Sequence, residues 1–222
     1  MSFDPASRSL LTRRDLDRFP EATLFHRIAR TVCLAECLPR KELYESWEVA
    51  RRTRRRFRGG RVVDLACGHA LTAWIMLILD ATSEAALAID RRLPDSADHL
   101  AAALSEVFPE AAAKLTRRAS DLGAVELAAT DVVVATHACG ALTDVVLSLA
   151  TAARARVAVL PCCHDVARCD TGGLLGWLDP ALAIDATRAI TLRAAGYRVH
   201  TQTIPSAITP MNRLLLGAPE QR

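Results

Sequence analysis

The chain has 222 residues, of which 51% are hydrophobic and only 5% aromatic, and its formal net charge at pH 7 is +3. This length suits one domain with an appendage or two small domains, and it buries enough surface to be stable without disulfides. The scarcity of aromatic side chains argues against a stacking platform for single-stranded nucleic acid. The modest charge does not by itself indicate a polyanionic partner.

The cysteines and the distribution of apolar residues indicate a reducing environment. Seven cysteines are present, an odd number, and residues 1–14 are polar and basic and do not resemble a secretory signal. No apolar run approaches the roughly 18 residues of a membrane span. We therefore expect a cytoplasmic protein with no membrane partner, whose cysteines are thiols or ligands and not disulfides.

Two amphipathic helices are predicted near the start of the chain. Residues 1–20 look like a frayed tail. Apolar residues at three- and four-residue steps predict a helix over 21–38, and a second helix is expected over 40–57, after Pro39.

A glycine pair, Gly59-Gly60, ends the second helix and predicts a hinge there. We therefore expect two parts: a helical extension or lid over residues 1–58, and a domain over residues 59–222.

Beyond the glycines, short apolar segments alternate with helical patterns. Strands are predicted over residues 61–66, 85–90, 114–119, 131–136, 156–160, 197–204 and 213–217. Helices are predicted over residues 72–79, 94–107, 143–153 and 180–195. This alternation predicts an α/β fold: a doubly wound, mostly parallel seven-stranded sheet of Rossmann-like type, covered on both faces. The last two strands have no helix between them, so we expect an antiparallel pair at one edge.

Small and polar residues follow five of the predicted strands, at residues 64–70, 90, 120–121, 136–140 and 161–164. In an open α/β sheet the ligand lies outside the carboxyl ends of the strands, where the strand order reverses. The five segments together are therefore a stronger signal for a binding site than any one of them.

The first of these segments is suited to the close approach of a nucleotide. Ala66, Gly68 and Ala70 are small residues at alternate positions. Leu71 stands where a dinucleotide fingerprint needs a further glycine, which argues against a nicotinamide cofactor. Asp90, a little over 20 residues further on, is placed to accept hydrogen bonds from ribose hydroxyls.

Residues 64–70 with Asp90 resemble the first two motifs of class I S-adenosylmethionine-dependent methyltransferases, in which an acidic residue precedes a GxGxG-type loop. Two more segments, His137-Ala-Cys139-Gly140 and Pro161-Cys162-Cys163-His164, resemble a subfamily that includes eukaryotic tRNA ribose 2′-O-methyltransferases acting on the acceptor stem. Residues 208–215 resemble that subfamily's final strand. The resemblance covers residues 62–217 and lacks the amino-terminal zinc-binding elements of those enzymes.

The resemblance implies S-adenosylmethionine as the cofactor and assigns roles to individual residues. Cofactor contacts are implied for Asp64, Ala66, Cys67, Gly68, Asp90, Arg91, Asp121 and His137. Among them, Asp64 would lie near the methionine amino group, Asp90 would hold the ribose, and Asp121 would face the adenine amino group. The acceptor side would be lined by His137, Cys139, Cys162, Cys163 and His164.

Methyl transfer from a sulfonium is an in-line displacement, so positioning supplies most of the catalysis. A base that acts near neutral pH suits histidine, and the candidates are His137 and His164. The alternative is that either histidine only forms hydrogen bonds with the loops.

The cysteines permit a competing interpretation. Cys139, Cys162, Cys163 and Cys169, with the two histidines, could converge on zinc or iron. Adjacent cysteines differ from the usual CxxC spacing, however, and neighbouring residues on a strand point to opposite sides of the sheet. We therefore predict no metal site.

Seven arginines lie between Arg51 and Arg61, and this basic cluster fits two interpretations. It could bind the phosphates of tRNA or another RNA, or it could be the solvated face of an amphipathic helix. Three functions remain open: a methyltransferase acting on RNA, a methyltransferase acting on a small molecule with the N-terminal helices as a lid, and a non-enzymatic nucleotide- or metal-binding protein.

Overall fold

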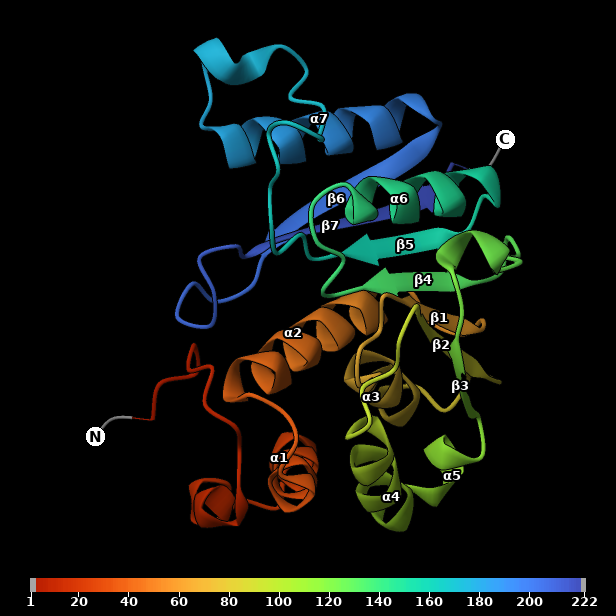
Figure 1. Ribbon diagram of the computed structural model, residues 1–222. Coiled ribbons are helices and arrows are strands. Elements are labelled where there is room, and N and C mark those ends of the chain that lie inside the picture. Colours follow the sequence, from red (N-terminus) through yellow and green to blue (C-terminus); the bar gives the residue numbers. More distant parts are fainter. Residues whose placement is uncertain (1–2, 221–222) are drawn as a thin grey trace.

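A seven-stranded sheet with helices on both faces forms the centre of the computed structural model, which describes residues 3–220 (Figure 1). The strand order is β3-β2-β1-β4-β5-β7-β6. The paired strands run parallel except where β7 pairs with β5 and with β6. The order reverses between β1 and β4, where the ligand crevice of a doubly wound sheet lies. The predicted fold class, including the antiparallel pair at one edge, is confirmed.

The strands are β1 (Val62–Leu65), β2 (Ala86–Asp90), β3 (Leu115–Ala119), β4 (Val132–Ala135), β5 (Arg156–Val159), β6 (Tyr197–Thr203) and β7 (Arg213–Pro219). The α-helices are α1 (Leu24–Ala35), α2 (Arg40–Arg56), α3 (Leu71–Leu79), α4 (Ala97–Val107), α5 (Pro109–Ala112), α6 (Leu142–Ala152) and α7 (Pro180–Ala194). Short 3-10 helices are η1 (Arg13–Arg18), η2 (Leu122–Ala124) and η3 (Leu174–Gly176). Within residues 3–220, no helix combines the length and the apolar character that crossing a membrane needs.

Alternate residues of the central strands enter two separate cores. Val132 and Val134 of β4 pack in a core with α1 to α5, whereas Val133 packs on the other face with α6 and α7. Because both faces are covered, the strands are aliphatic throughout and do not alternate between apolar and polar residues.

The N-terminal segment is ordered, which corrects the expectation of a frayed tail. Leu11 and Phe19 are fully buried, and the Leu11 amide donates a hydrogen bond to the Leu38 carbonyl oxygen at 2.9 Å. The apolar residues of this segment are sparse and show no helical or strand periodicity. Its order depends on contacts with distant residues, which local sequence patterns do not reveal. Helix α1 is also shorter than predicted: Thr23 caps its start, and Glu36 ends it in the left-handed conformation with φ of 52°.

Helices α1 and α2 pack into the same core as one face of the sheet. Ile28 of α1 and Leu43 of α2 are fully buried in the cluster that contains Val62 and Val132. Residues 3–58 and 59–220 therefore share a hydrophobic core, and the predicted division of the chain into residues 1–58 and 59–222 stays a prediction. Gly60 at the junction has φ of 76°, and a Cβ there would collide with the Thr130 carbonyl oxygen. Packing at the junction therefore requires glycine at this position.

Arg54 fixes the carboxyl end of α2 to the end of α3. Its guanidinium is buried, lies 3.3 Å from the Asp80 carboxylate and donates to Ser83 Oγ at 2.6 Å. Burial lowers the pKa of Arg54 to about 10, so the group remains charged at neutral pH. Burial alone would raise the pKa of Asp80, but hydrogen bonds from Thr82, the Gly59 amide and the charge of Arg54 hold it below its ordinary value.

We predict that Arg54→Ala lowers the free energy of unfolding by about 3–5 kcal/mol, because it removes the buried cationic partner of the Asp80 carboxylate and leaves only the exposed Arg58, at 3.7 Å. Urea denaturation followed by circular dichroism measures the change. The matched control is Arg55→Ala, since Arg55 is the exposed neighbour on the same helix. A loss from Arg54→Ala no larger than that from the control would contradict the role assigned to this ion pair.

Candidate active site

The loop between β1 and α3 contains three residues in the left-handed conformation. These are Ala66, Gly68 and Ala70, with φ of 58°, 52° and 61°. For the two alanines this conformation costs on the order of 1 kcal/mol each, and it persists only where surrounding contacts impose it. Hydrogen bonds from the Cys67 amide to the Ile89 carbonyl (3.0 Å) and from the Ala70 amide to the Cys67 carbonyl (2.8 Å) supply such contacts. The loop is therefore strained and held in place.

Two carboxylates also fix the position of this loop through hydrogen bonds. Asp90, the last residue of β2, accepts a hydrogen bond from the Gly68 amide on Oδ2 at 2.9 Å. Asp64 of β1 is buried and accepts a hydrogen bond from the Ala73 amide in the first turn of α3 at 3.1 Å. The sheet register places both acids at the carboxyl ends of neighbouring strands, because Leu65 of β1 pairs with Ile89 of β2.

Burial raises the pKa of Asp64 to about 7; the hydrogen bond from Ala73 opposes this rise and the nearby charge of Asp90 adds to it. The carboxyl is therefore about half protonated at neutral pH. A cation placed beside it would favour the ionised form.

His137 follows the end of β4 and is half-buried, with its Nε2 atom buried. Its Nε2 atom has no hydrogen-bond partner among residues 3–220. Burial lowers its pKa to about 4, with smaller contributions from the charges of Lys41 and His69. The imidazole is therefore neutral at physiological pH and keeps an unused nitrogen, which in a native site calls for an explanation such as a ligand. Nearby, Thr136 and Thr72 join β4 to α3 through a hydroxyl–hydroxyl hydrogen bond of 2.8 Å.

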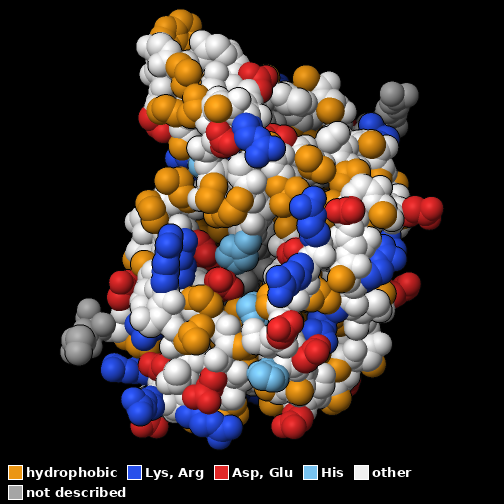
Figure 2. Space-filling model, in the orientation of Figure 1, with side chains coloured by type: hydrophobic (Ala, Val, Ile, Leu, Met, Phe, Trp, Pro, Cys, Tyr) orange, Lys and Arg blue, Asp and Glu red, His pale blue; other side chains and the backbone are white. Residues whose placement is uncertain are grey.

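These groups line one small pocket, which the N-terminal helices close. The lining residues are Leu38, Glu42, Ser46, Asp64, Ala66, Cys67, His69, Leu71, Thr72, Thr136 and His137. The pocket's free volume is about 10 Å³, enough for a single water molecule. On this side of the molecule, histidine side chains border a hollow in the middle of the surface (Figure 2). A larger ligand must therefore displace the residues that α2 and the turn before it contribute.

The α2 contribution to this pocket was missed by sequence reasoning. Glu42 is half-buried; burial raises its pKa, the neighbouring Glu45 adds to the rise, and Lys41 opposes it. No local pattern marks Leu38, Glu42 or Ser46 as pocket residues, because their position depends on how α2 packs against α3.

Arg91 and Asp121 lie on the exposed rim beyond Asp90. The two side chains form an ion pair of 3.4 Å and are 88% and 76% exposed. The Ser120 amide donates to the Asp90 carbonyl oxygen at 2.9 Å, which keeps Asp121 beside the end of β2. An ion pair this exposed adds little stability, so both side chains are available to a ligand.

The thiols of Cys139, Cys162 and Cys163 converge, which corrects the argument that neighbouring cysteines must point apart. The Cys139 sulfur lies 2.9 Å from that of Cys162 and 3.4 Å from that of Cys163. Alternation applies only within a strand, and residues 161–164 lie beyond the end of β5 in an irregular segment. Burial raises the pKa of Cys139, and burial together with the other two thiols raises that of Cys162. Cys169 lies apart from the group, buried against Arg188.

His164 belongs to a different cluster from His137. Its Nε2 lies 2.8 Å from Asp185 Oδ1, and Arg213 Nε donates to Asp185 Oδ2 at 2.6 Å. Burial alone would raise the pKa of Asp185, but the hydrogen bonds from His164 and Arg213 hold it below its ordinary value. Sequence reasoning missed Asp185, although its three-residue spacing from Arg188 on a predicted helix indicates paired charges on one helix face.

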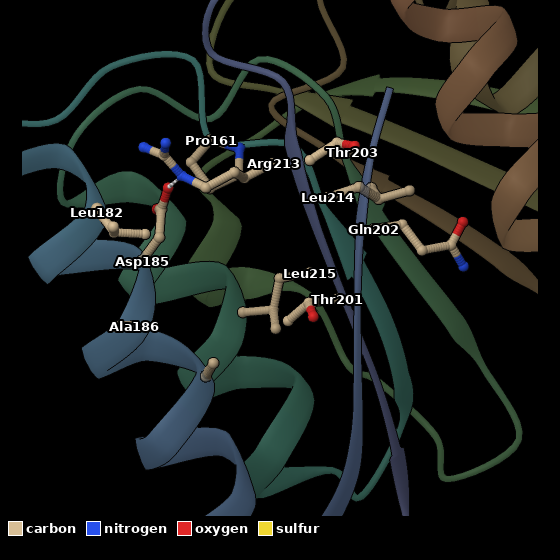
Figure 3. A pocket seen from close by; sticks show the side chains of 11 residues that line it. Pro161, Leu182, Asp185, Ala186, Thr201, Gln202, Thr203, Arg213, Leu214 and Leu215 are labelled. Atoms are coloured by element: carbon tan, nitrogen blue, oxygen red, sulfur yellow. Dashed lines mark hydrogen bonds and ion pairs between the residues drawn. The ribbon is translucent and has the colours of Figure 1, made fainter. Parts of the chain in front are cut away.

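A larger cavity, of about 510 Å³, lies beside this cluster between α7 and strands β6 and β7 (Figure 3). Most of its lining is apolar, and Asp185 and Arg213 point toward each other at one side. This size and lining are typical of a small-molecule pocket. Pro161 also lines it, so it borders the segment that carries Cys162 and Cys163.

Most of the basic cluster forms ion pairs within the chain. Arg51 and Arg52 both contact Glu48 at 2.8 Å, and Arg54 and Arg58 both contact Asp80.

The last arginines of the cluster lie at the opposite end of the sheet from the pocket, whereas Arg52 donates to Gln202 near the end of β6 at 3.1 Å. Arg61, which pairs with Asp131 at 2.7 Å, precedes β1, and Arg156, the first residue of β5, donates to the Arg58 carbonyl. Helix α2 has 17 residues and is about 25 Å long; Glu42 and Ser46 in its first half line the pocket, and the arginines begin at Arg51 in its second half.

The sheet is doubly wound and seven-stranded, and β7 runs antiparallel between β5 and β6. Carboxylates stand at the ends of β1 and β2. These features define a Rossmann-like methyltransferase fold. A family model described as "Methyltransferase domain" matches residues 41–169, which is more than half of the chain. The chain therefore belongs to this methyltransferase family. Among curated proteins, none matches the sequence significantly.

Solved structures share the fold. An O-methyltransferase family protein from Burkholderia thailandensis superposes with a TM-score of 0.54 at 18% identity, over 94% of this chain and 63% of that one. The S-adenosylmethionine-dependent methyltransferase SibL gives 0.54 at 20% identity, over 96% and 66%. The tRNA methyltransferase TrmK of B. subtilis gives 0.51 at 14% identity, over 78% and 66%. The chain thus spans just under two thirds of these proteins, and identities this low establish the fold alone.

Proposed function

We propose that the protein is an S-adenosylmethionine-dependent methyltransferase that binds its cofactor across the carboxyl ends of β1, β2 and β3. The observation that carries the proposal is the left-handed loop held by the Gly68–Asp90 hydrogen bond, with Asp64 and His137 on the same small pocket. Membership of the methyltransferase family supports it.

Each carboxylate has a distinct proposed role. Asp90 uses Oδ2 to orient the loop, and its second oxygen is proposed to accept a ribose hydroxyl. The buried Asp64, with its raised pKa, is proposed to face the cofactor's ammonium group, which would favour its ionised form. Asp121, and Arg91 beside it, are proposed to border the adenine at the exposed rim. Ala66, Cys67 and Gly68 bring the backbone close to the nucleoside.

His137 is the proposed base, and it fits better than His164. It is neutral, lines the cofactor pocket and keeps an unpaired buried nitrogen. The methyl group would pass from the sulfonium to the acceptor heteroatom, the acceptor proton would pass to His137, and S-adenosylhomocysteine would leave. His164 is already engaged by Asp185, so we assign it to positioning on the acceptor side.

The N-terminal segment is proposed to act as a lid. Leu38, Glu42 and Ser46 fill the space that the cofactor's methionine end needs, since the free volume is about 10 Å³. Binding must therefore move the turn between α1 and α2, while the buried Arg54 holds the other end of α2 in place.

The proposed acceptor is a small molecule. The cavity of about 510 Å³ between α7 and strands β6 and β7 suits such a ligand, and most of the arginines offered as an RNA surface are paired with acids. Transfer to RNA is the second candidate, favoured by the HxCG and CCH motifs, whose subfamily resemblance stays a prediction.

We predict that wild-type protein binds S-adenosylhomocysteine with micromolar affinity and that Asp90→Ala weakens binding about tenfold or more, through loss of a charged hydrogen bond worth roughly 1.5–3 kcal/mol. Isothermal titration calorimetry measures both constants. Asp95→Ala is the matched control, because Asp95 is an exposed acid in the segment that follows Asp90, between β2 and α4. Equal affinity of a folded Asp90→Ala variant and the control would remove Asp90 from the site.

For the acceptor class, we predict that bulk tRNA incubated with wild-type protein and radiolabelled S-adenosylmethionine gains no label above the level seen with Asp90→Ala. The physical reason is that the arginines needed to hold phosphates are engaged within the chain. Labelling of tRNA by wild-type protein, lost in Asp90→Ala, would contradict the small-molecule assignment and support the RNA candidate.

A further inference from the structure

We propose that Cys139, Cys162 and Cys163 bind one thiophilic divalent cation, with Zn²⁺ the best fit, through three thiolates. The site lies on the loops that follow β4 and β5. It goes beyond methyl transfer, and metal binding there does not depend on the proposed function.

The spacing of the three sulfur atoms fits a common metal ligand set. The sulfur–sulfur distances are 2.9 Å, 3.4 Å and 3.8 Å, and all three atoms lie within 4.8 Å of one another. Zinc with Zn–S bonds near 2.3 Å and tetrahedral angles separates its sulfurs by about 3.8 Å. One pair already has this separation, and the other two reach it by outward shifts of less than about 1 Å.

The thiols have no competing partners. Over the described residues 3–220, their side-chain hydrogen bonds are with one another only. Cys139 and Cys163 are exposed and Cys162 is half-buried, so a cation can reach the group from solvent. Three soft donors without a hard oxygen ligand among them favour zinc over magnesium or calcium.

Helix α7 holds both cysteine loops in place. The buried Arg188 donates to the carbonyl oxygen of Gly140, next to Cys139, at 2.9 Å. Asp185, one turn earlier on α7, pairs with His164, next to Cys163, at 2.8 Å. Arg188 also contacts Asp185 at 3.3 Å, so one charged pair links the two loops.

This clamp has two consequences for the metal site. The thiols converge because the fold fixes both loops, and the ligand set is therefore preorganised. Three protein ligands leave the fourth tetrahedral position for water or another exchangeable ligand, as in zinc sites that are not purely structural.

The test is metal stoichiometry of the full chain. Protein is reduced, stripped with a chelator and reconstituted with Zn²⁺ or Co²⁺, and bound metal is measured by plasma mass spectrometry. We expect about one zinc per chain and, with cobalt, a thiolate-to-cobalt charge-transfer absorption. Cys139→Ser, Cys162→Ser and Cys163→Ser should each lose stoichiometric zinc, whereas Cys37→Ser, a half-buried thiol outside the group, should retain it.

Two outcomes would overturn the site. The first is wild-type protein that remains zinc-free after reduction and reconstitution. This outcome includes a Cys139–Cys162 disulfide, found by peptide mass spectrometry, whose reduced thiols still bind no zinc. The second is equal zinc content in wild type and in a triple serine variant that is folded by circular dichroism. The cobalt absorption is measured on the wild type alone, so it tests the metal site even if the serine variants do not fold.

Discussion

The hydrogen bond from the Gly68 amide to the Asp90 carboxylate is the contact on which the proposed site depends. It holds the loop after β1 against the end of β2, and Ala66, Gly68 and Ala70 of this loop adopt left-handed conformations. The buried Asp64 holds the other end of the loop through the first turn of α3. Because the sheet is parallel here, the same edge also receives His137 from β4, and the reversal of strand order leaves a crevice between them.

Helix α2 connects this site to the stability of the whole fold. Its first turns lie over the pocket through Glu42 and Ser46, and its last turn carries Arg54, buried against Asp80. The two ends of α2 thus have different roles: its amino end must move when a ligand enters the pocket, and its carboxyl end is fixed by Arg54. This division places the proposed motion in the turn around Leu38 and assigns the arginines a mainly structural role.

The sequence predicted the sheet well because its signal is local. The valines of β4 form an uninterrupted apolar run, and small residues follow it, so both the strand and its loop could be recognised. The grouping of Asp64, Ala66, Cys67 and His137 followed from the rule that ligands bind at carboxyl ends.

What the sequence did not predict depends on tertiary contacts. Three contacts each join residues more than 20 positions apart: the closure of the pocket by Leu38, the pairing of His164 with Asp185, and the burial of Arg54 against Met76. Helical periodicity alone does not show which neighbouring element each helix face contacts. The convergence of Cys162 with Cys163 was excluded by a rule for strands, and it arises because that segment is not a strand.

The most direct test is the pH dependence of S-adenosylhomocysteine binding, measured by calorimetry on wild type and on Asp64→Asn. The free carboxyl has a pKa of about 7, and an ammonium group beside it would lower that pKa in the complex. Binding then releases a proton, so affinity should rise about tenfold from about pH 6 to about pH 8 and stay flat in the asparagine variant. A wild-type affinity that is constant or falls over this range would contradict the placement of the cofactor's cationic end against Asp64.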